Sequence, residues 1–251
     1  MARDLRFLMK RRGGFRYSSA SLHPLATSVG FLDDLKRQAD ALKAQQTTDL
    51  AALARNTALT EAACKTTFAY FNTLVDQLGV LRPASHARFA LDRQHVFQGL
   101  RLDDFHVDAR RKRLRDEDVT DFIVLHWQLR SGRKLQLVKD FVGDIEKLEP
   151  RLRQSGAEVD SEAVREPDNG RLLGMRYTFT ADFRGSVRVT PQHDEGLVAF
   201  QFHNLDGLES IKVEFPATEV GQSRLDELAR WLVGQPHAFL ANGQRLRRVE
   251  A

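Results

Sequence analysis

Apolar residues recur at helical spacing in the first part of the chain and at strand spacing in the last part. Between residues 29 and 81 they return every three or four positions, whereas between residues 119 and 216 they alternate with polar residues. A basic region rich in turn residues joins the two. This division predicts an α+β fold in which an N-terminal helical segment or helical hairpin precedes a mostly antiparallel β-sheet, a meander with helices packed on one face.

The helical segment contains two apolar stretches. The first steps by three and four through Leu32, Leu35, Ala39 and Leu42. Polar residues 45–48 interrupt this spacing before Leu50 and Leu53 resume it, so a break near residues 46–49 or 56–60 is compatible with the pattern. The second stretch comprises Cys64, Phe68, Phe71, Val75 and Leu78. Gly79, with Pro83 beyond it, predicts the end of the helix. Two antiparallel helices, or one long helix and a shorter one, would both fit.

Alternation of apolar and polar residues predicts the strands. Residues 83–118 indicate short strands broken by polar turns, with 110–118 as a charged hairpin loop, and residues 119–138 indicate a hairpin that turns at Ser131-Gly132. A short helix is expected over residues 142–153, and residues 155–170 are expected to form an exposed excursion. Four strands follow around residues 175–179, 187–189, 198–202 and 211–215 in meander order, and a last helix covers about 223–233.

These elements divide the chain into four parts. Residues 1–27 form a basic N-terminal arm, residues 28–82 the helical segment, residues 83–236 an antiparallel sheet domain with two helices, and residues 237–251 a basic C-terminal tail. We find no residue-level repeat between the two halves of the sheet region.

The composition is that of a globular chain. Of 251 residues, 42% are hydrophobic and 29% charged, which argues against disorder. The single cysteine, Cys64, excludes an internal disulfide framework and a cysteine-rich zinc site, so we expect a cytoplasmic protein. No run approaches the roughly 18 apolar residues of a membrane span. We therefore expect no segment that crosses a membrane.

Basic residues gather in three places, although the net charge is only +4. The residues that could contact nucleic acid are Arg6, Lys10, Arg11 and Arg12, then Arg110, Arg111, Lys112 and Arg113, and finally Arg247 and Arg248. Acidic residues 116–118 follow the middle cluster at once and offset much of its field. Nucleic-acid binding would require the three clusters to converge in space.

Candidate chemistry is sparse. Asp104, His106 and Asp108 would emerge on one face of a strand and could hold a divalent ion, but a solvent-facing strand gives the same pattern. His193 stands at a predicted turn beside two acids, without a partner that would make it a catalytic base. No strained serine nucleophile and no phosphate-cradling loop is present. We therefore assign no catalytic residue and expect no metal and no cofactor.

Three functional hypotheses remain open. The leading one is a non-enzymatic binding or assembly protein that uses the helical segment for self-association or for a protein partner and the sheet as scaffold, through Leu35, Leu42, Phe68 and Phe71. The alternative is a nucleic-acid-binding protein. The third is an enzyme or small-ligand carrier with a pocket on the sheet. A helix that packs only within its own chain would bury all four candidate residues, whereas a docking helix would expose them.

Overall fold

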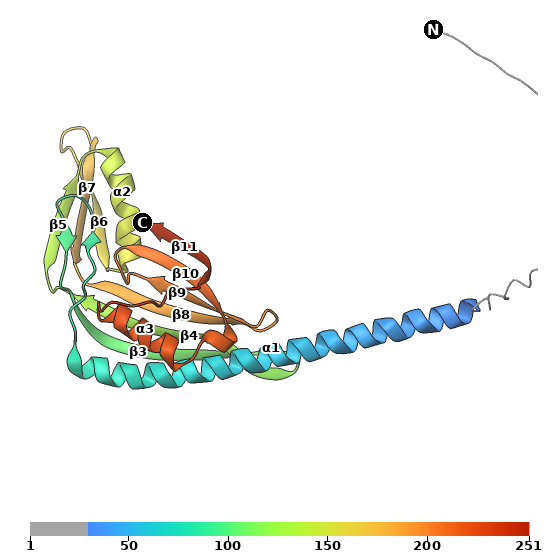
Figure 1. Ribbon diagram of the computed structural model, residues 1–251. Coiled ribbons are helices and arrows are strands. Elements are labelled where there is room, and N and C mark those ends of the chain that lie inside the picture. The colour runs from blue at the N-terminus through green and yellow to red at the C-terminus, as the bar shows by residue number, and fades with distance from the viewer. Residues whose placement is uncertain (1–29, 251) are drawn as a thin grey trace, which may run out of the picture. The chain divides into compact units, whose positions relative to one another are not determined.

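The computed structural model describes residues 30–250 and confirms an α+β fold with antiparallel sheets (Figure 1). The chain divides into two compact units after Gln46, within helix α1 (Phe31–Leu81). The N-terminal arm, with Arg6, Lys10, Arg11 and Arg12, lies outside the described residues.

Helix α1 is one continuous helix of 51 residues. The helical-hairpin alternative was wrong. The polar residues 45–48 left open either a continuous helix or a break near residues 46–49 or 56–60, and the helix is continuous. Near the second of these positions, Thr57 Oγ1 donates to the Leu53 carbonyl at 2.9 Å, a hydrogen bond that is compatible with helical geometry. The helix ends at Leu81, two residues beyond Gly79, where Arg82 takes the left-handed conformation (φ 42°) instead of a glycine.

A six-stranded antiparallel sheet forms the larger part of the second unit. Its strands are β3 (Arg101–Leu114), β4 (Glu117–Arg130), β8 (Phe183–Gln192), β9 (Leu197–His203), β10 (Glu209–Pro216) and β11 (Gln244–Glu250), in the order β11-β10-β9-β8-β4-β3. The predicted meander is confirmed for β8, β9 and β10, but its expected first strand, β7 (Leu172–Thr180), does not pair with β8 and belongs to another sheet. The expected C-terminal tail is instead the edge strand β11, and most of the expected charged loop lies on edge strand β3, which turns at residues 115–116.

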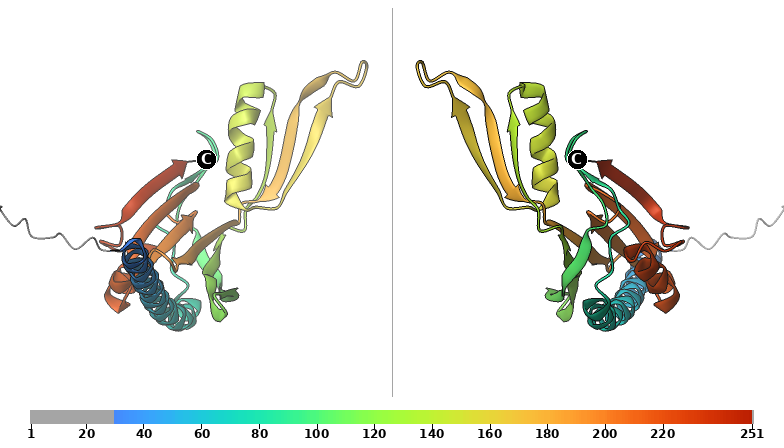
Figure 2. Two further views of the ribbon diagram at one scale, coloured as in Figure 1. Left: turned by 90° about the vertical axis from the view of Figure 1, so that its right-hand side faces the viewer. Right: turned by 90° about the vertical axis from the view of Figure 1, so that its left-hand side faces the viewer.

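A second sheet of three strands was not expected. It consists of β5 (Lys134–Lys139), β7 (Leu172–Thr180) and β6 (Val159–Arg165), in that order, with helix α2 (Val142–Ser155) alongside (Figure 2). The hairpin across Ser131-Gly132 was therefore wrong, because β5 pairs with β7 and not with β4. The Asp182 carboxylate accepts hydrogen bonds from the backbone N–H groups of Ser131 and Gly132 at 2.8 and 2.9 Å, which fixes the chain where it leaves β4. Strand β6 occupies the expected exposed excursion.

The remaining elements are short. Strands β1 (Phe89–Ala90) and β2 (Val96–Phe97) pair with each other, and the 3₁₀ turn η1 (Ala217–Glu219) precedes helix α3 (Gln222–Leu232). The predicted helices at α2 and α3 are both confirmed. Helix α3 lies on the same face of the six-stranded sheet as the part of α1 that belongs to the second unit (Figure 2).

The core lies between that sheet face and the two helices. Phe200, Phe215 and Phe239 are fully buried, and the Phe239 ring centroid is 5.3 Å from that of Phe200 and 5.4 Å from that of Phe215. Phe71 and Leu78 of α1 are 0% and 2% exposed. Burying each such side chain contributes about 1.5–3 kcal/mol, so this packing holds the second part of α1 on the sheet.

Gly185 of β8 offers a test of this core. A methyl group there would overlap the indole of Trp127, which is buried on the neighbouring strand β4. We expect Gly185→Ala to lower the free energy of unfolding by about 1–3 kcal/mol, because overpacking forces a rigid ring to move.

Gly79→Ala is the matched control, because its methyl meets nothing within 4 Å. We expect this variant to raise the free energy of unfolding by about 1 kcal/mol through helix propensity. Urea denaturation of both variants measures the difference, and equal effects would contradict this account of the core.

Candidate functional site

A buried histidine contacts both helix α1 and the six-stranded sheet. His193 is 4% exposed, with Nδ1 2.7 Å from Thr60 Oγ1 of α1 and Nε2 2.9 Å from the Thr120 carbonyl of β4. A carbonyl only accepts, so Nε2 carries a proton and donates it. In the neutral ring, Nδ1 is an acceptor, and the Thr60 hydroxyl, which also lies 3.0 and 2.9 Å from the Asn56 and Thr57 carbonyls, can donate its single proton to it. This contact joins three segments that are distant in sequence.

Polar contacts on both sides of His193 extend this attachment. Glu61 Oε1 accepts from the Thr120 N–H at 2.7 Å, and Asn56 Nδ2 donates to the Asp194 carbonyl at 2.8 Å. Cys64 is 1% exposed on the same helix, and burial, reinforced by the charge of Glu61, raises the pKa of its thiol to about 12. A thiol with this pKa is neutral at physiological pH, so Cys64 serves as a small core residue and not as a nucleophile.

The first part of α1 carries an apolar stripe on its surface. We define the exposed apolar stripe as Leu32, Leu35, Ala39 and Leu42, all of them exposed and spaced by three and four residues. The three leucine side chains are 78%, 44% and 60% exposed. Leu50, eight residues beyond Leu42 and in the second unit, is 63% exposed as well. Two of the four residues proposed from sequence, Leu35 and Leu42, thus lie on this surface.

The other two proposed residues differ from each other. Phe68 is 39% exposed, so part of its ring is accessible. Phe71 is fully buried in the core beneath the sheet, where no partner could contact it. Leu35 and Leu42 are therefore the better-exposed pair of the four, and Phe71 belongs to the core.

The charges beside the exposed apolar stripe are balanced. Residues 31–46 contain three acids, Asp33, Asp34 and Asp40, and three bases, Lys36, Arg37 and Lys43, so their net charge is zero. Arg37 and Asp34 form an exposed ion pair at 3.2 Å. Such pairs stabilise a helix only slightly. The segment therefore presents an apolar surface without a net charge that would repel a second copy.

The two described basic clusters do not converge. Arg110, Arg111, Lys112 and Arg113 lie on β3, at one edge of the six-stranded sheet, and Arg247 and Arg248 lie on β11, at the opposite edge. The basic residues of β3 have carboxylates nearby: Lys112 lies 3.3 Å from Asp121 and Arg111 lies 3.8 Å from Glu61. Arg248 likewise contacts Glu209 at 3.3 Å. Charged side chains on an edge strand discourage pairing with another sheet, which is an ordinary structural role for this cluster.

The histidines on the outer side of β3 and β4 do not form a metal centre. His106 and His126 face each other across the two strands with ring centroids 5.3 Å apart, and Asp104 Oδ1 lies 2.8 Å from His106 Nε2. Within residues 30–250, no group of three or more histidine, cysteine, aspartate or glutamate side chains has the arrangement to hold a metal ion. The pattern of Asp104, His106 and Asp108 is that of a solvent-facing strand.

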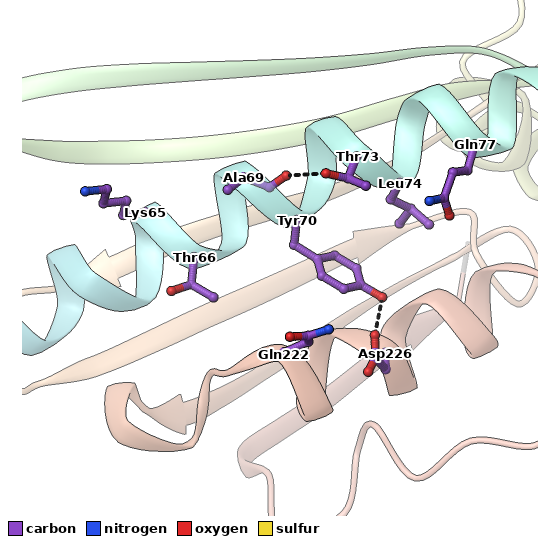
Figure 3. A pocket seen from close by; sticks show the side chains of 9 residues that line it. All are labelled: Lys65, Thr66, Ala69, Tyr70, Thr73, Leu74, Gln77, Gln222 and Asp226. Atoms are coloured by element: carbon purple, nitrogen blue, oxygen red, sulfur yellow. Dashed lines mark hydrogen bonds between the residues drawn. The ribbon is translucent and has the colours of Figure 1, made fainter.

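A cavity of about 660 Å³ lies between α1 and α3 (Figure 3). Its lining residues are Lys65, Thr66, Ala69, Tyr70, Thr73, Leu74, Gln77, Gln222 and Asp226. The Tyr70 hydroxyl donates to Asp226 Oδ1 at 2.7 Å across the cavity. Burial, together with the hydrogen bond to Asp226, raises the pKa of Tyr70 above its ordinary value, so the phenol stays protonated. The cavity lining therefore offers hydrogen-bonding groups, among them the Tyr70–Asp226 pair, the Lys65 ammonium and the Gln77 and Gln222 amides.

Comparison with protein-family models, with curated proteins and with solved structures finds no match to this chain. Within residues 30–250, no helix combines the length and the apolar character needed to cross a bilayer.

The contact between Thr60 and His193 can be tested by removing one hydroxyl. Thr60→Val keeps the shape of the side chain but leaves His193 Nδ1 buried without a donor, so we expect the free energy of unfolding to fall by about 1–3 kcal/mol. Thr66→Val is the matched control in the same helix, because Thr66 is exposed and its hydroxyl contacts only the Ala62 carbonyl. Its effect should stay within about 0.5 kcal/mol. Chemical denaturation measures the free energy of unfolding of both variants. Equal decreases in this free energy would show that the contact between Thr60 and His193 is not what stabilises this region.

Proposed function

We propose that this chain is a non-enzymatic assembly protein, in which the exposed apolar stripe of helix α1 binds a second copy of the chain and the sheets serve as scaffold. One observation carries the proposal. The stripe has the same spacing as the buried side of α1 in the second unit, yet its leucines are 44–78% exposed.

The energetics of helices support a partner for this segment. Most helical stability in proteins comes from the packing of an apolar face. Residues 31–50 are all exposed, so intrinsic propensity and local ion pairs are the stabilising terms that the described residues supply there. Burying each leucine against a partner would contribute about 1.5–3 kcal/mol.

A second copy is the partner that the charges favour. A surface with a net charge of zero does not repel its own duplicate, whereas a strongly basic or acidic helix would favour a partner of opposite charge. Two copies can also bury identical stripes against each other in one symmetric interface, which is the commonest arrangement of soluble oligomers.

The other two hypotheses draw less support from the described residues. The nucleic-acid hypothesis requires basic clusters that converge in space. The two described clusters instead lie on opposite edges of one sheet. In the cavity between α1 and α3, burial and the hydrogen bond to Asp226 raise the pKa of Tyr70 and keep the phenol protonated, which argues against its use as a nucleophile. Both hypotheses stay predictions.

Light scattering on the purified full chain tests the proposal. We expect the wild type to be a dimer whose mass falls toward that of the monomer on dilution. The double variant Leu35→Ala and Leu42→Ala should be monomeric at the same concentration, because it removes two leucines from each side of the interface and weakens association by several kcal/mol. Alanine keeps the helix propensity, so the loss would arise from the surface and not from unfolding.

Leu59→Ala is the matched control. Leu59 is also an exposed leucine of α1, but it falls outside the three-and-four spacing of the stripe, and its truncation should leave the mass unchanged. A wild-type chain that remains a monomer at every concentration would overturn the proposal. So would a dimer that both variants leave intact.

A further inference from the structure

We infer that the two copies pair as parallel helices in register, with Gln46 of one copy against Gln46 of the other. The inference rests on the assembly proposal and adds to it the orientation and the register of the partner. The carrying observation is the order of side chains around the exposed apolar stripe.

The stripe has the spacing of a coiled-coil seam. In a heptad lettered a to g, Leu32 and Ala39 take position a, and Leu35 and Leu42 take position d. Gln46 takes the next a position and is exposed. Residues 32–46 therefore supply two heptads of seam that end at one polar residue.

The flanking positions distinguish the two orientations. Position e holds Lys36 and Lys43, and position g holds Gln38 and Gln45. In a parallel pair, e of one helix faces g of the other, so each lysine meets a glutamine. In an antiparallel pair, e faces e, so the lysines of one copy would meet the lysines of the other. Repulsion between like charges disfavours the antiparallel pair.

Gln46 favours the same orientation. A glutamine amide carries both donors and acceptors, so two such groups facing each other can form hydrogen bonds across the seam. Parallel pairing in register brings the two copies of this residue together. Antiparallel pairing would instead set Gln46 against a d position such as Leu35, and the amide would lose its partner as it leaves water. A single polar a position is an established means of fixing register.

Disulfide trapping tests this arrangement in the full chain. In a Cys64→Ala background, which removes the one native thiol, Gln46→Cys places a cysteine on the seam. Under mild oxidation we expect this variant to form a covalent dimer at least about tenfold faster than the control Arg37→Cys, because pairing raises the local thiol concentration. Arg37 is exposed and lies outside the seam at position f.

A second arm detects the opposite orientation. The Gln46→Cys chain is mixed with a size-tagged Leu35→Cys chain, and the parallel arrangement predicts no product that joins the two chains, because these positions are 11 residues apart, about 16 Å along the helix. A mixed product without Gln46-to-Gln46 linkage would overturn the inference in favour of antiparallel pairing. Light scattering on the same reduced samples separates the two failures. A dimer that does not cross-link at Gln46 refutes only the orientation, whereas a monomer refutes the assembly proposal and the inference with it.

Discussion

Helix α1 carries an apolar stripe, and an apolar stripe on a helix requires a surface to cover it. Over the second unit the six-stranded sheet supplies that surface, and Phe71 and Leu78 are buried against it. The same face of the sheet packs against both α1 and α3. The core between the sheet and α3 therefore also depends on this contact. Over residues 32–42 the described residues supply no such surface, and the leucines stay exposed. The proposed assembly follows from applying one physical requirement to the whole helix.

The buried polar contacts give the sheet-bound part of α1 a fixed position along the sheet. Apolar packing alone tolerates small shifts of a helix, but His193 reaches its two partners, Thr60 and Thr120, only in one register. A buried hydrogen-bonding group left without its partner destabilises the fold, so this contact penalises alternatives. These contacts therefore fix the position of the middle part of α1, from Asn56 to Glu61, on the sheet.

The local pattern predicted the fold class, the strands β8 to β10 and the helices α2 and α3, because alternation and periodicity are properties of neighbouring residues. It could not predict that β5 and β7 form a separate sheet, since pairing depends on contacts such as that of Asp182 with Ser131, 51 positions apart. The candidate site shows the same limit. Leu35 and Phe71 share one spacing, yet one is exposed and the other buried, and only the tertiary structure distinguishes them.

Amide hydrogen exchange along α1, measured at low and at high protein concentration, tests the central claim most directly. Residues 57–78 should be strongly protected at both concentrations, because one side of this part of the helix is buried within one chain, from Thr57 to Leu78. Residues 31–50 should exchange rapidly at low concentration and become protected at high concentration, when a second copy covers the exposed apolar stripe. Protection of residues 31–50 that is strong at both concentrations would contradict the account, since it would mean that the chain covers this stripe by itself.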